Sequence, residues 1–328
     1  MRAVVLESYG EPEVLQIQTV ADPVAGPEEV VVEIVATALN RADLLQRRGF
    51  YPGPPMPKEI PGMEFSGRVI ALGERVSEVS VGDEVMGIVG GGAYAEQIAV
   101  HARQVIPIPI TVAVEDAAAI PEVFITAFDA LVVQGGLTSG RVALVHAGGS
   151  GVGTAAIQIA KAIGARVIVT ASTGKIAACL ALGADRAVDY NAEDFVEAVR
   201  EFTDGRGVDA VLDVIGGDYV ERNIDSVRVQ GRIIQVGVMG GGVVPVNIAK
   251  LLPKRAALVG TVLRARPLEE KIAISQNFAT QLVPRFEDGS LRPVIDSRYP
   301  LDRIAEAHAT MESNANVGKI VIDVAAAP

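Results

Sequence analysis

The hydrophobic and polar positions follow one pattern through the first third of the chain. Short runs rich in β-branched residues are bounded by glycine, proline and other turn residues, which is typical of strands. They predict strands over residues 4–6, 29–35, 67–72 and 84–88. Residues 51–57 contain four prolines, which lack a backbone N–H and fix φ, so this segment is predicted to be an irregular loop. Such loops often line binding sites.

From about residue 115 the pattern changes to alanine-rich helical stretches that alternate with short apolar runs. Helices are expected over residues 154–164, 176–182 and 195–202. Strands are expected over residues 142–146, 166–170, 208–212, 231–236 and 256–260. This alternation predicts an α/β fold with a doubly wound parallel sheet and right-handed connections. Two further helices, over 269–285 and 301–313, precede a last strand over 319–322, which we expect to return to the N-terminal β domain.

Composition narrows the class of protein. The 328 residues suffice for two domains, and 49% hydrophobic with 21% charged residues is typical of a soluble globular protein. A net charge of -11 disfavours nucleic acid or an anionic membrane as a partner. A single cysteine, Cys179, permits neither an intrachain disulfide nor a cysteine-based zinc site, and it indicates a reducing compartment, the cytoplasm. No apolar stretch reaches the length of a membrane span.

A glycine-rich turn lies between a predicted strand and a predicted helix. In Ala147-Gly148-Gly149-Ser150-Gly151-Val152-Gly153, residues 148, 150 and 153 occupy the three glycine positions of a dinucleotide fingerprint, the middle one being serine. Small residues let the pyrophosphate approach bare amides at the helix N-terminus. The context favours a dinucleotide site over a merely structural turn.

The segment after the next strand bears on the choice of nicotinamide. A site for NAD usually has an acidic residue here, about 20 residues past the fingerprint. The sequence instead reads Thr170-Ala171-Ser172-Thr173-Gly174-Lys175, with hydroxyls and a lysine suited to a 2′-phosphate. A helix N-cap at Ser172 followed by a solvated lysine would look the same. We favour NADPH because the acid is missing.

Hydride transfer needs an acceptor polarised by a metal or by proton donors. The histidines are His101, His146 and His308, and Cys179 falls on a predicted helix, so no zinc cluster is expected. We expect His146 to be packed or bonded to a turn, and His308 to lie at the surface. Gly149-Ser150-Gly151 lacks the nucleophile elbow of a Ser-His-Asp hydrolase.

Several motifs spread over the whole chain are similar to those of one enzyme family. They are Ala38-Leu39-Asn40-Arg41-Ala42-Asp43-Leu44, Pro61-Gly62-Met63-Glu64-Phe65-Ser66-Gly67, Ala118-Ala119-Ile120-Pro121-Glu122, the glycine-rich turn and Asn316-Val317-Gly318-Lys319-Ile320-Val321. With them the chain resembles the zinc-free quinone oxidoreductase branch of the medium-chain dehydrogenase/reductase superfamily, and most of all the tumour-suppressor-inducible quinone oxidoreductases. In zinc-bearing relatives a cysteine stands at the position of Asn40 and a histidine at that of Met63, while Glu64 remains.

The resemblance implies three groups of cofactor contacts. The pyrophosphate would lie on the turn formed by Gly148, Gly149, Ser150, Gly151 and Val152. The adenosine 2′-phosphate end would be held by Ser172, Lys175 and Tyr190. The nicotinamide would be surrounded by Asn40, Thr126, Val238 and Leu263, with Asn316 approaching from the C-terminal strand.

The resemblance also implies the catalytic residues Asn40, Tyr51 and Thr126. Tyr51, on the proline-rich loop, looks like a substrate-side residue, and Asn40 and Tyr51 would donate hydrogen bonds to a quinone oxygen as the hydride arrives. Each has a plainer alternative. Tyr51 would merely pack on prolines, Tyr190 would merely end a strand, and Thr126 would merely cap a helix.

The resemblance implies two domains and a dimer. A GroES-like catalytic domain would comprise residues 1–120 and 264–328, and a Rossmann NADPH-binding domain residues 121–263. A homodimer would be joined through the strand over 256–260.

We therefore expect a zinc-independent NADPH:quinone oxidoreductase. Two alternatives stay open. One is an NADPH-dependent reductase of α,β-unsaturated carbonyls, which uses the same hydride. The other is an NADPH-binding sensor or structural protein with little turnover.

Overall fold

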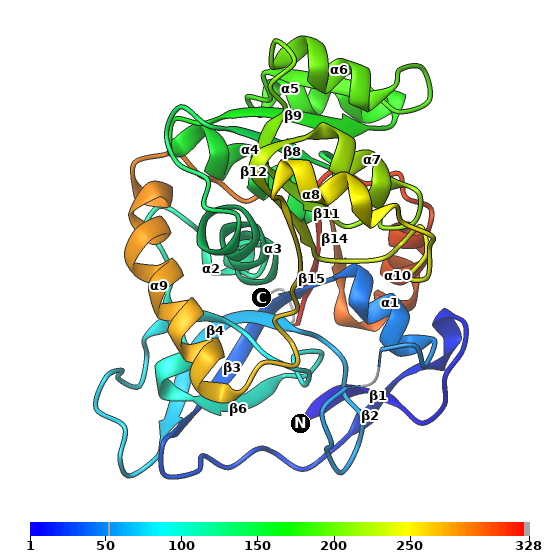
Figure 1. The fold of residues 1–328 in the computed structure, drawn as a ribbon. Coiled ribbons are helices and arrows are strands. Elements are labelled where there is room, and N and C mark those ends of the chain that lie inside the picture. The colour runs from blue at the N-terminus through cyan, green and yellow to red at the C-terminus, as the bar shows by residue number, and fades with distance from the viewer. Residues whose placement is uncertain (52, 325–328) are drawn as a thin grey trace. The chain divides into compact units, whose positions relative to one another are not determined.

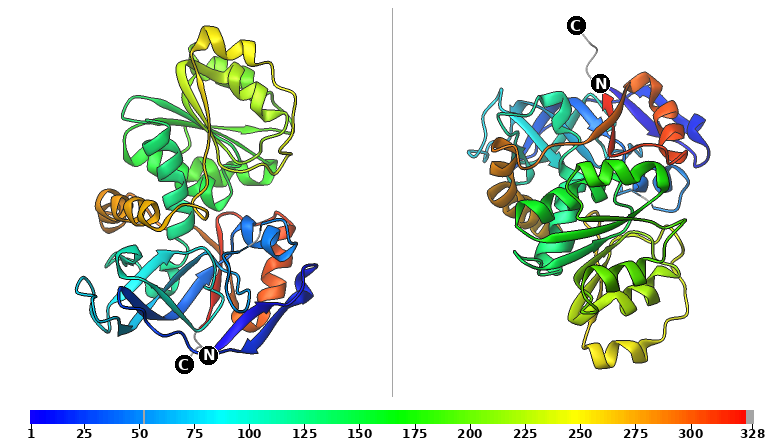
Figure 2. Two further views of the ribbon diagram at one scale, coloured as in Figure 1. Left: turned by 60° about the horizontal axis from the view of Figure 1, so that its bottom comes forward. Right: turned by 90° about the horizontal axis from the view of Figure 1, so that it is seen from above.

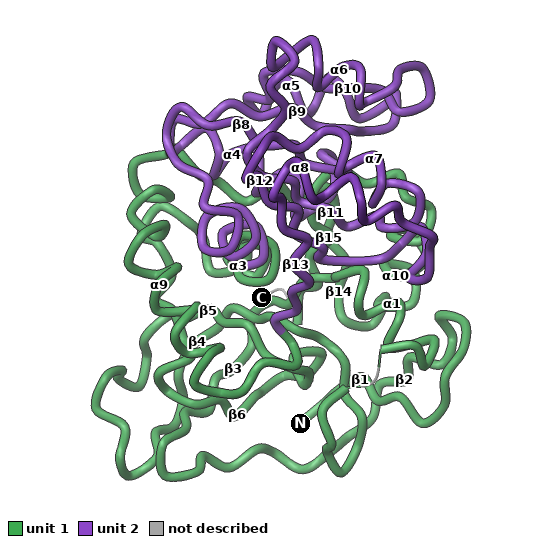
Figure 3. Tube along the Cα trace, in the orientation of Figure 1, with its two compact units in different colours: residues 1–125, 264–328 green, residues 126–263 purple. Residues whose placement is uncertain are grey.

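The computed structural model describes residues 1–51 and 53–324 (Figure 1). The chain folds into two compact units (Figure 3). Unit 1 comprises residues 1–125 and 264–328, and unit 2 comprises residues 126–263. The chain passes from unit 1 to unit 2 within helix α3 (Pro121–Phe128). Among the described residues, no helix is long and apolar enough to cross a bilayer.

Unit 1 is built around a mostly antiparallel sheet whose strands follow the order β14-β15-β3-β4-β5-β7, with β6 also paired to β3. These strands are β3 (Glu29–Ala38), β4 (Glu64–Leu72), β5 (Glu84–Ile88), β6 (Gln97–His101), β7 (Ile106–Pro107), β14 (Ile295–Pro300) and β15 (Lys319–Asp323). A separate ribbon pairs β1 (Arg2–Leu6) with β2 (Leu15–Thr19). The last strand, β15, pairs with β3, so the predicted return of the chain end to the N-terminal β domain is confirmed.

The helices of unit 1 are α1 (Arg41–Arg47), α2 (Val114–Ala117), the start of α3, α9 (Leu268–Glu287) and α10 (Ile304–Glu312). One apolar core joins the strands of this unit to α10. On α10 the buried positions are Ile304, Ala307, His308 and Met311, the i, i+3, i+4, i+7 spacing of one helical face. The described residues of the proline-rich loop, 51 and 53–57, form neither helix nor strand, as predicted.

Unit 2 contains a parallel sheet in the order β10-β9-β8-β11-β12-β13, the arrangement of a dinucleotide-binding Rossmann fold. Its strands are β8 (Val142–Val145), β9 (Arg166–Ala171), β10 (Arg186–Asp189), β11 (Val208–Asp213), β12 (Val227–Gln235) and β13 (Ala257–Gly260). Helices α4 (Gly151–Ala162), α5 (Ile176–Ala181), α6 (Phe195–Phe202), α7 (Tyr219–Ser226) and α8 (Leu251–Lys254) cover its faces (Figure 2).

The burial of the central strands explains the composition that predicted them. All four residues of β8 are buried, because helices cover both faces of a parallel sheet and no polar face is needed. The edge strand β14 of unit 1 instead alternates between half-buried and exposed residues. The predicted fold class, a Rossmann sheet together with a GroES-like β-rich domain, is confirmed.

Candidate functional site

The glycine-rich turn of unit 2 follows β8 and leads into α4, as its sequence context predicted. Ser150 is the N-cap of α4, where its hydroxyl accepts a hydrogen bond from the Gly153 N–H at 3.0 Å. The N–H groups of Gly151 and Val152 have no acceptor among the described residues. These two donors at the positive end of a helix are suited to a pyrophosphate.

Close packing explains the small residues of this turn. A Cβ on Gly153 would lie 2.2 Å from the Ala147 carbonyl oxygen, and one on Gly148 would lie 2.8 Å from the Val169 side chain. A Cβ on Gly149 would lie 2.7 Å from Cδ of Lys175, so the lysine stem passes over the turn. The residues of the turn therefore fit a nicotinamide dinucleotide.

The three residues predicted to hold the 2′-phosphate lie at the carboxyl ends of two neighbouring strands. Ser172 follows β9 and stands at the N-cap position of a short 3₁₀ helix (Thr173–Lys175), with no capping hydrogen bond to its side chain. Tyr190 follows β10, is 44% exposed, and donates its N–H to the Ala171 carbonyl at 3.3 Å. The structure thus brings Ser172, Lys175 and the turn at Gly149 together in unit 2.

An acidic side chain that sequence reasoning overlooked lies at the same edge. Asp189, the last residue of β10, accepts hydrogen bonds from the Thr173 hydroxyl at 2.5 Å and from the Asn191 N–H at 3.0 Å. The Thr173 bond is the largest cause of the lowered pKa of this carboxyl. The bond from Thr173 fixes Asp189 against the 3₁₀ helix. The acid of an NAD site ends the second strand of the sheet, here β9, whereas Asp189 ends the following strand, β10.

A buried chain of hydrogen bonds crosses the same end of the sheet. Asn223 donates to Asp213 Oδ2 at 2.8 Å, and its Oδ1 lies 2.7 Å from Nε2 of His146. The other ring nitrogen, Nδ1, lies 3.0 Å from the Thr170 hydroxyl. The Asp213 carboxylate can only accept, so the Asn223 amide nitrogen donates to it. Asn223 Oδ1 is then an acceptor, and His146 Nε2 must carry the hydrogen that it donates to Asn223. His146 is a packed histidine, as predicted, and burial lowers its pKa.

The other predicted residues of unit 2 are more scattered. Thr126 is the sixth residue of α3, so the alternative in which it caps a helix is wrong. Val238 is 54% exposed, whereas Leu263 is buried and only 7% exposed. The contact of these three side chains with a nicotinamide stays a prediction.

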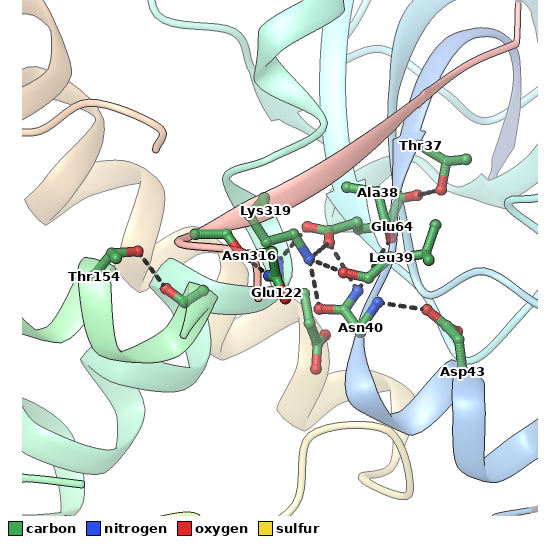
Figure 4. A network of polar contacts seen from close by, with 12 residues as sticks. Thr37, Ala38, Leu39, Asn40, Asp43, Glu64, Glu122, Thr154, Asn316 and Lys319 are labelled. Carbon is green, nitrogen blue, oxygen red and sulfur yellow. Dashed lines mark hydrogen bonds and ion pairs between the residues drawn. The ribbon is translucent and has the colours of Figure 1, made fainter. Parts of the chain in front are cut away.

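A buried polar network surrounds Asn40 in unit 1 (Figure 4). The Lys319 ammonium donates to Leu39 O at 2.6 Å, to Asn40 Oδ1 at 2.7 Å and to Glu64 Oε1 at 2.7 Å. Asn40 Nδ2 donates to Glu64 Oε1 at 2.8 Å and to Ala38 O at 3.3 Å. The second carboxylate oxygen of Glu64 accepts the Glu122 N–H at 2.8 Å.

The network satisfies all three donors of the ammonium and occupies both carboxylate oxygens of Glu64. The side chains of Lys319 and Glu64 are 3% and 0% exposed, and Asn40 is 8% exposed. Sequence reasoning overlooked Lys319, because 255 residues separate it from Glu64.

This arrangement does not fit a zinc ion. The Glu64 carboxylate already carries an ammonium, an amide and a backbone N–H, and the neighbouring Met63 is a buried thioether. Across residues 1–51 and 53–324, no three His, Cys, Asp or Glu side chains gather as a metal site. The cation beside Asn40 is the side chain of Lys319.

Two buried titratable residues lie beside this network. Burial raises the pKa of Asp43 to about 6, although its Oδ2 accepts the Asn40 N–H at 2.8 Å. His308 has no exposed surface, so the expectation that it lies at the surface is wrong. Its Nε2 lies 3.4 Å from the Tyr94 hydroxyl, and burial lowers its pKa to about 3. His308 falls on the apolar stripe of α10, which explains the error.

Tyr51 is half-buried and held next to Arg264. The guanidinium lies 4.8 Å from the centre of the Tyr51 ring, and its NH1 donates to the Tyr51 carbonyl at 3.1 Å. Burial raises the pKa of Tyr51, so its hydroxyl stays protonated. The alternative in which Tyr51 only packs against prolines does not account for Arg264. Asn316, just before β15, is buried and only 8% exposed. Its side-chain amide donates to the Gly318 carbonyl at 2.9 Å.

Two family models match the chain. One, described as the alcohol dehydrogenase GroES-like domain, matches residues 26–110. The other, described as zinc-binding dehydrogenase, matches residues 151–278. A quinone oxidoreductase of Lama guanicoe is 32% identical over 98% of this chain and 97% of its own length. The human synaptic vesicle membrane protein VAT-1 homolog is 31% identical over 98% of this chain and 86% of its own length.

Solved structures agree with these relatives. The Escherichia coli quinone oxidoreductase complexed with NADPH has a TM-score of 0.89 at 29% identity, over 99% of this chain and all of its own. An NAD-dependent alcohol dehydrogenase has a TM-score of 0.87 at 34% identity, with the same coverage. The JamJ enoyl reductase has a TM-score of 0.88 at 26% identity, over 98% of each chain.

Both halves of the fold, the fingerprint turn and relatives that match nearly end to end lead to one assignment. The chain belongs to the medium-chain dehydrogenase/reductase superfamily, in its quinone oxidoreductase branch, and is an oxidoreductase of that family.

Proposed function

We propose that this protein is an NADPH:quinone oxidoreductase that works without a metal. The observation that carries the proposal is the arrangement of Ser172 and Lys175 at the carboxyl end of β9, where the lysine stem crosses the fingerprint turn. NADPH, when bound, supplies a hydride. The amides of Gly151 and Val152 would bind its pyrophosphate.

The choice of NADPH over NADH rests on charge. A lysine and a serine hydroxyl next to the adenosine ribose favour a 2′-phosphate, and no acid ends β9. Asp189 is close by, but its oxygens accept hydrogen bonds from Thr173 and Asn191. Tyr190, exposed beside them, would cover the adenosine.

At the acceptor end, Tyr51 is the better candidate of the two predicted donors. Both hydrogens of the Asn40 amide already have acceptors, in Glu64 and Ala38. The Tyr51 hydroxyl has no partner among the described residues, and its raised pKa keeps the proton in place. We propose that Tyr51 donates to the quinone oxygen as negative charge develops there, while Asn40 shapes the nicotinamide site. Thr126 and Asn316 would contact the nicotinamide.

A second candidate acceptor is an α,β-unsaturated carbonyl. It is favoured by the likeness to an enoyl reductase structure, which covers almost the whole chain. The reaction would use the same hydride and the same hydroxyl donor, because an enone also develops negative charge on its oxygen.

We also propose a homodimer joined through β13. Among the described residues this strand pairs only with β12, and its Leu258 is 44% exposed. Pairing two such edges would satisfy open backbone groups. A monomeric mass in sedimentation at micromolar protein contradicts this proposal.

The deciding experiment follows oxidation of NADPH and NADH with 1,2-naphthoquinone and a simple enal as parallel acceptors. We expect turnover with the quinone and a clear preference for NADPH. Lys175→Met should raise KM for NADPH by roughly 10- to 100-fold and leave KM for NADH nearly unchanged, because the lost contact is to the phosphate.

Lys161→Met serves as the matched control, since Lys161 is on α4 of the same unit and pairs with Asp185 at 2.8 Å. Faster reduction of the enal would move the function to the second candidate. Equal losses with both nucleotides in Lys175→Met would refute the phosphate assignment, and no turnover with either acceptor would refute the reductase.

A further inference from the structure

A half-buried cluster of positive charge lies beside Tyr51, entirely within unit 1. Arg264 and Lys271 both reach the loop at Gly90 and Gly91. A Cβ on Gly90 would lie 3.9 Å from Lys271 Nζ, and one on Gly91 would lie 3.7 Å from Arg264 NH2. Burial lowers the pKa of Lys271, and the nearby charge of Arg264 lowers it further. In a chain with a net charge of -11, such a pairing of like charges calls for an explanation.

Arg264 is fixed in place by its surroundings. Its Nε donates to Gly90 O at 2.6 Å, its NH2 to Gln46 Oε1 at 2.6 Å and its NH1 to Tyr51 O at 3.1 Å. A guanidinium has five N–H donors, so two of them have no acceptor within residues 1–51 and 53–324. The group is therefore preorganised, since binding a further acceptor costs little side-chain entropy.

Lys271 has no such partners. In the described part of the chain its ammonium makes no hydrogen bond and no ion pair, although the side chain is half-buried. Its neighbours on α9, Glu269 and Glu270, are exposed, and Glu269 pairs with Arg103 at 3.0 Å. A partly desolvated charge without a counter-ion is unfavourable unless a ligand supplies one.

The acid that interacts with both of these cations, Glu122, is mostly neutral at physiological pH. Burial, and then the charge of Glu64, raise the pKa of Glu122 to about 8. The side chain of Glu122 points away from the Lys319 ammonium (Figure 4), and the charge of Lys319 offsets these two effects only in part. The charged groups that act on Glu122 are Glu64, Asp43, Lys319, Arg264 and Lys271. Below pH 8 the cluster thus keeps an excess of positive charge.

We propose that Arg264 and Lys271 form a subsite for a carboxylate carried by the acceptor, next to Tyr51. The inference rests on the proposed function and narrows its substrate class to quinones or enones with an acidic side chain. Arg264 would offer its two remaining N–H donors to the carboxylate, and Lys271 would add a point charge. The reducible carbonyl of the same molecule would then lie within reach of the Tyr51 hydroxyl.

The test uses a matched pair of acceptors, a methylated benzoquinone with a propionate side chain and the methyl ester of the same compound. For the wild-type enzyme we expect kcat/KM for the acid to exceed that for the ester by roughly tenfold, with the difference in KM. Added salt should raise KM for the acid alone, because it screens the attraction.

Lys271→Met should bring the ratio of acid to ester close to one and leave kcat/KM for the ester within about twofold, as expected for one lost charge contact. Lys271 is the position to change because its ammonium holds no other described residue in place. Arg285→Met is the control, since Arg285 is on the same helix and pairs only with Asp288 in the described residues. It should leave the ratio unchanged.

A second variant tests the role of Glu122. As the pH rises above 8, ionised Glu122 should repel the carboxylate, so KM for the acid should rise in the wild type. In Glu122→Gln this rise should be absent, while the ester shows no rise in either protein.

The outcomes separate this inference from the proposed function. If the ester is reduced but the acid has no advantage, or if Lys271→Met keeps the wild-type ratio, the subsite is refuted and the reductase stands. If neither quinone is reduced, the proposed function fails, and calorimetric binding of the acid then decides. Binding that Lys271→Met abolishes supports the subsite, and its absence in the wild type overturns it.

Discussion

At the scale of single residues, Lys319 connects the buried polar groups around Asn40. Its ammonium joins a backbone carbonyl, the Asn40 amide and the Glu64 carboxylate in a site from which water is excluded. A buried ion pair of this kind adds little net stability when intact, because desolvation offsets the attraction. Removing one partner is costly, since the other is left as an uncompensated buried charge.

We therefore expect Lys319→Met to lower the free energy of unfolding by about 3 to 5 kcal/mol. The double variant Lys319→Met with Glu64→Gln should recover part of this loss, because no unpaired charge then remains. Urea unfolding followed by circular dichroism measures both. Equal stability of the single and double variants would show that the cost comes from packing and not from charge.

At the scale of elements, the best predicted parts of the fold are those with a strong local signal. Helix α6 spans the predicted residues 195–202, where apolar and charged positions alternate with helical period. Strand β8 was equally clear, because its apolar run is short and lies between turn residues. Strand β14 was not predicted. It lies at the edge of its sheet, where no residue is fully buried, so its sequence has no run of apolar residues. Helix α3 was also overlooked, although Pro121 at its first position is a typical start signal.

The candidate site was predicted less completely, for a physical reason. The residues of the glycine-rich turn lie next to one another in the sequence, so their spacing alone indicates their role. Lys319 and Arg264 act on partners more than 200 residues away, and no local pattern marks such pairs. His308 was misplaced, although its position on the stripe Ile304, Ala307 and Met311 contained the signal.

The turn into α4 provides a sharp test of an element. Gly153→Ala should raise Kd for NADPH at least tenfold, because its Cβ would lie 2.2 Å from the Ala147 carbonyl and the turn must shift. Helix propensity acts in the opposite direction, since alanine is favoured over glycine by about 1 kcal/mol. Gly260→Ala, on β13, is the control, because a Cβ there meets nothing within 4 Å. Unchanged binding in Gly153→Ala would contradict the close packing of the turn.

At the scale of the whole molecule, stability depends on pH through buried groups that act in opposite directions. His308 has a folded pKa of about 3, below its usual 6.5, so between these values the unfolded chain binds more protons and stability rises with pH. Glu122 has a folded pKa of about 8, above its usual 4.5. Over that range the folded state binds more protons, and stability falls as the pH rises.

We expect Glu122→Gln to remove the second effect. The variant should match the wild type near pH 4.5 and exceed its free energy of unfolding above pH 8 by an amount on the order of 2 kcal/mol, less than the full pKa shift implies because the side chain is partly exposed. Denaturant unfolding at both ends of this range measures the difference. A constant difference at every pH would mean that the substitution acts through packing.

The place of β15 in its sheet has a consequence for how the protein emerges from the ribosome. Residues 126–263 are continuous, so unit 2 has all of its strands once they have been synthesised. Unit 1 must wait, because β15 lies between β14 and β3 and brings with it the lysine that pairs with Glu64. Until residues 319–323 have left the exit tunnel, residues 36–38 of β3 lack β15 on one side and the buried Glu64 carboxylate lacks its cation. The middle of the chain is thus set to fold before its beginning, and a ribosome that stalls before it has synthesised β15 leaves unit 1 open to aggregation.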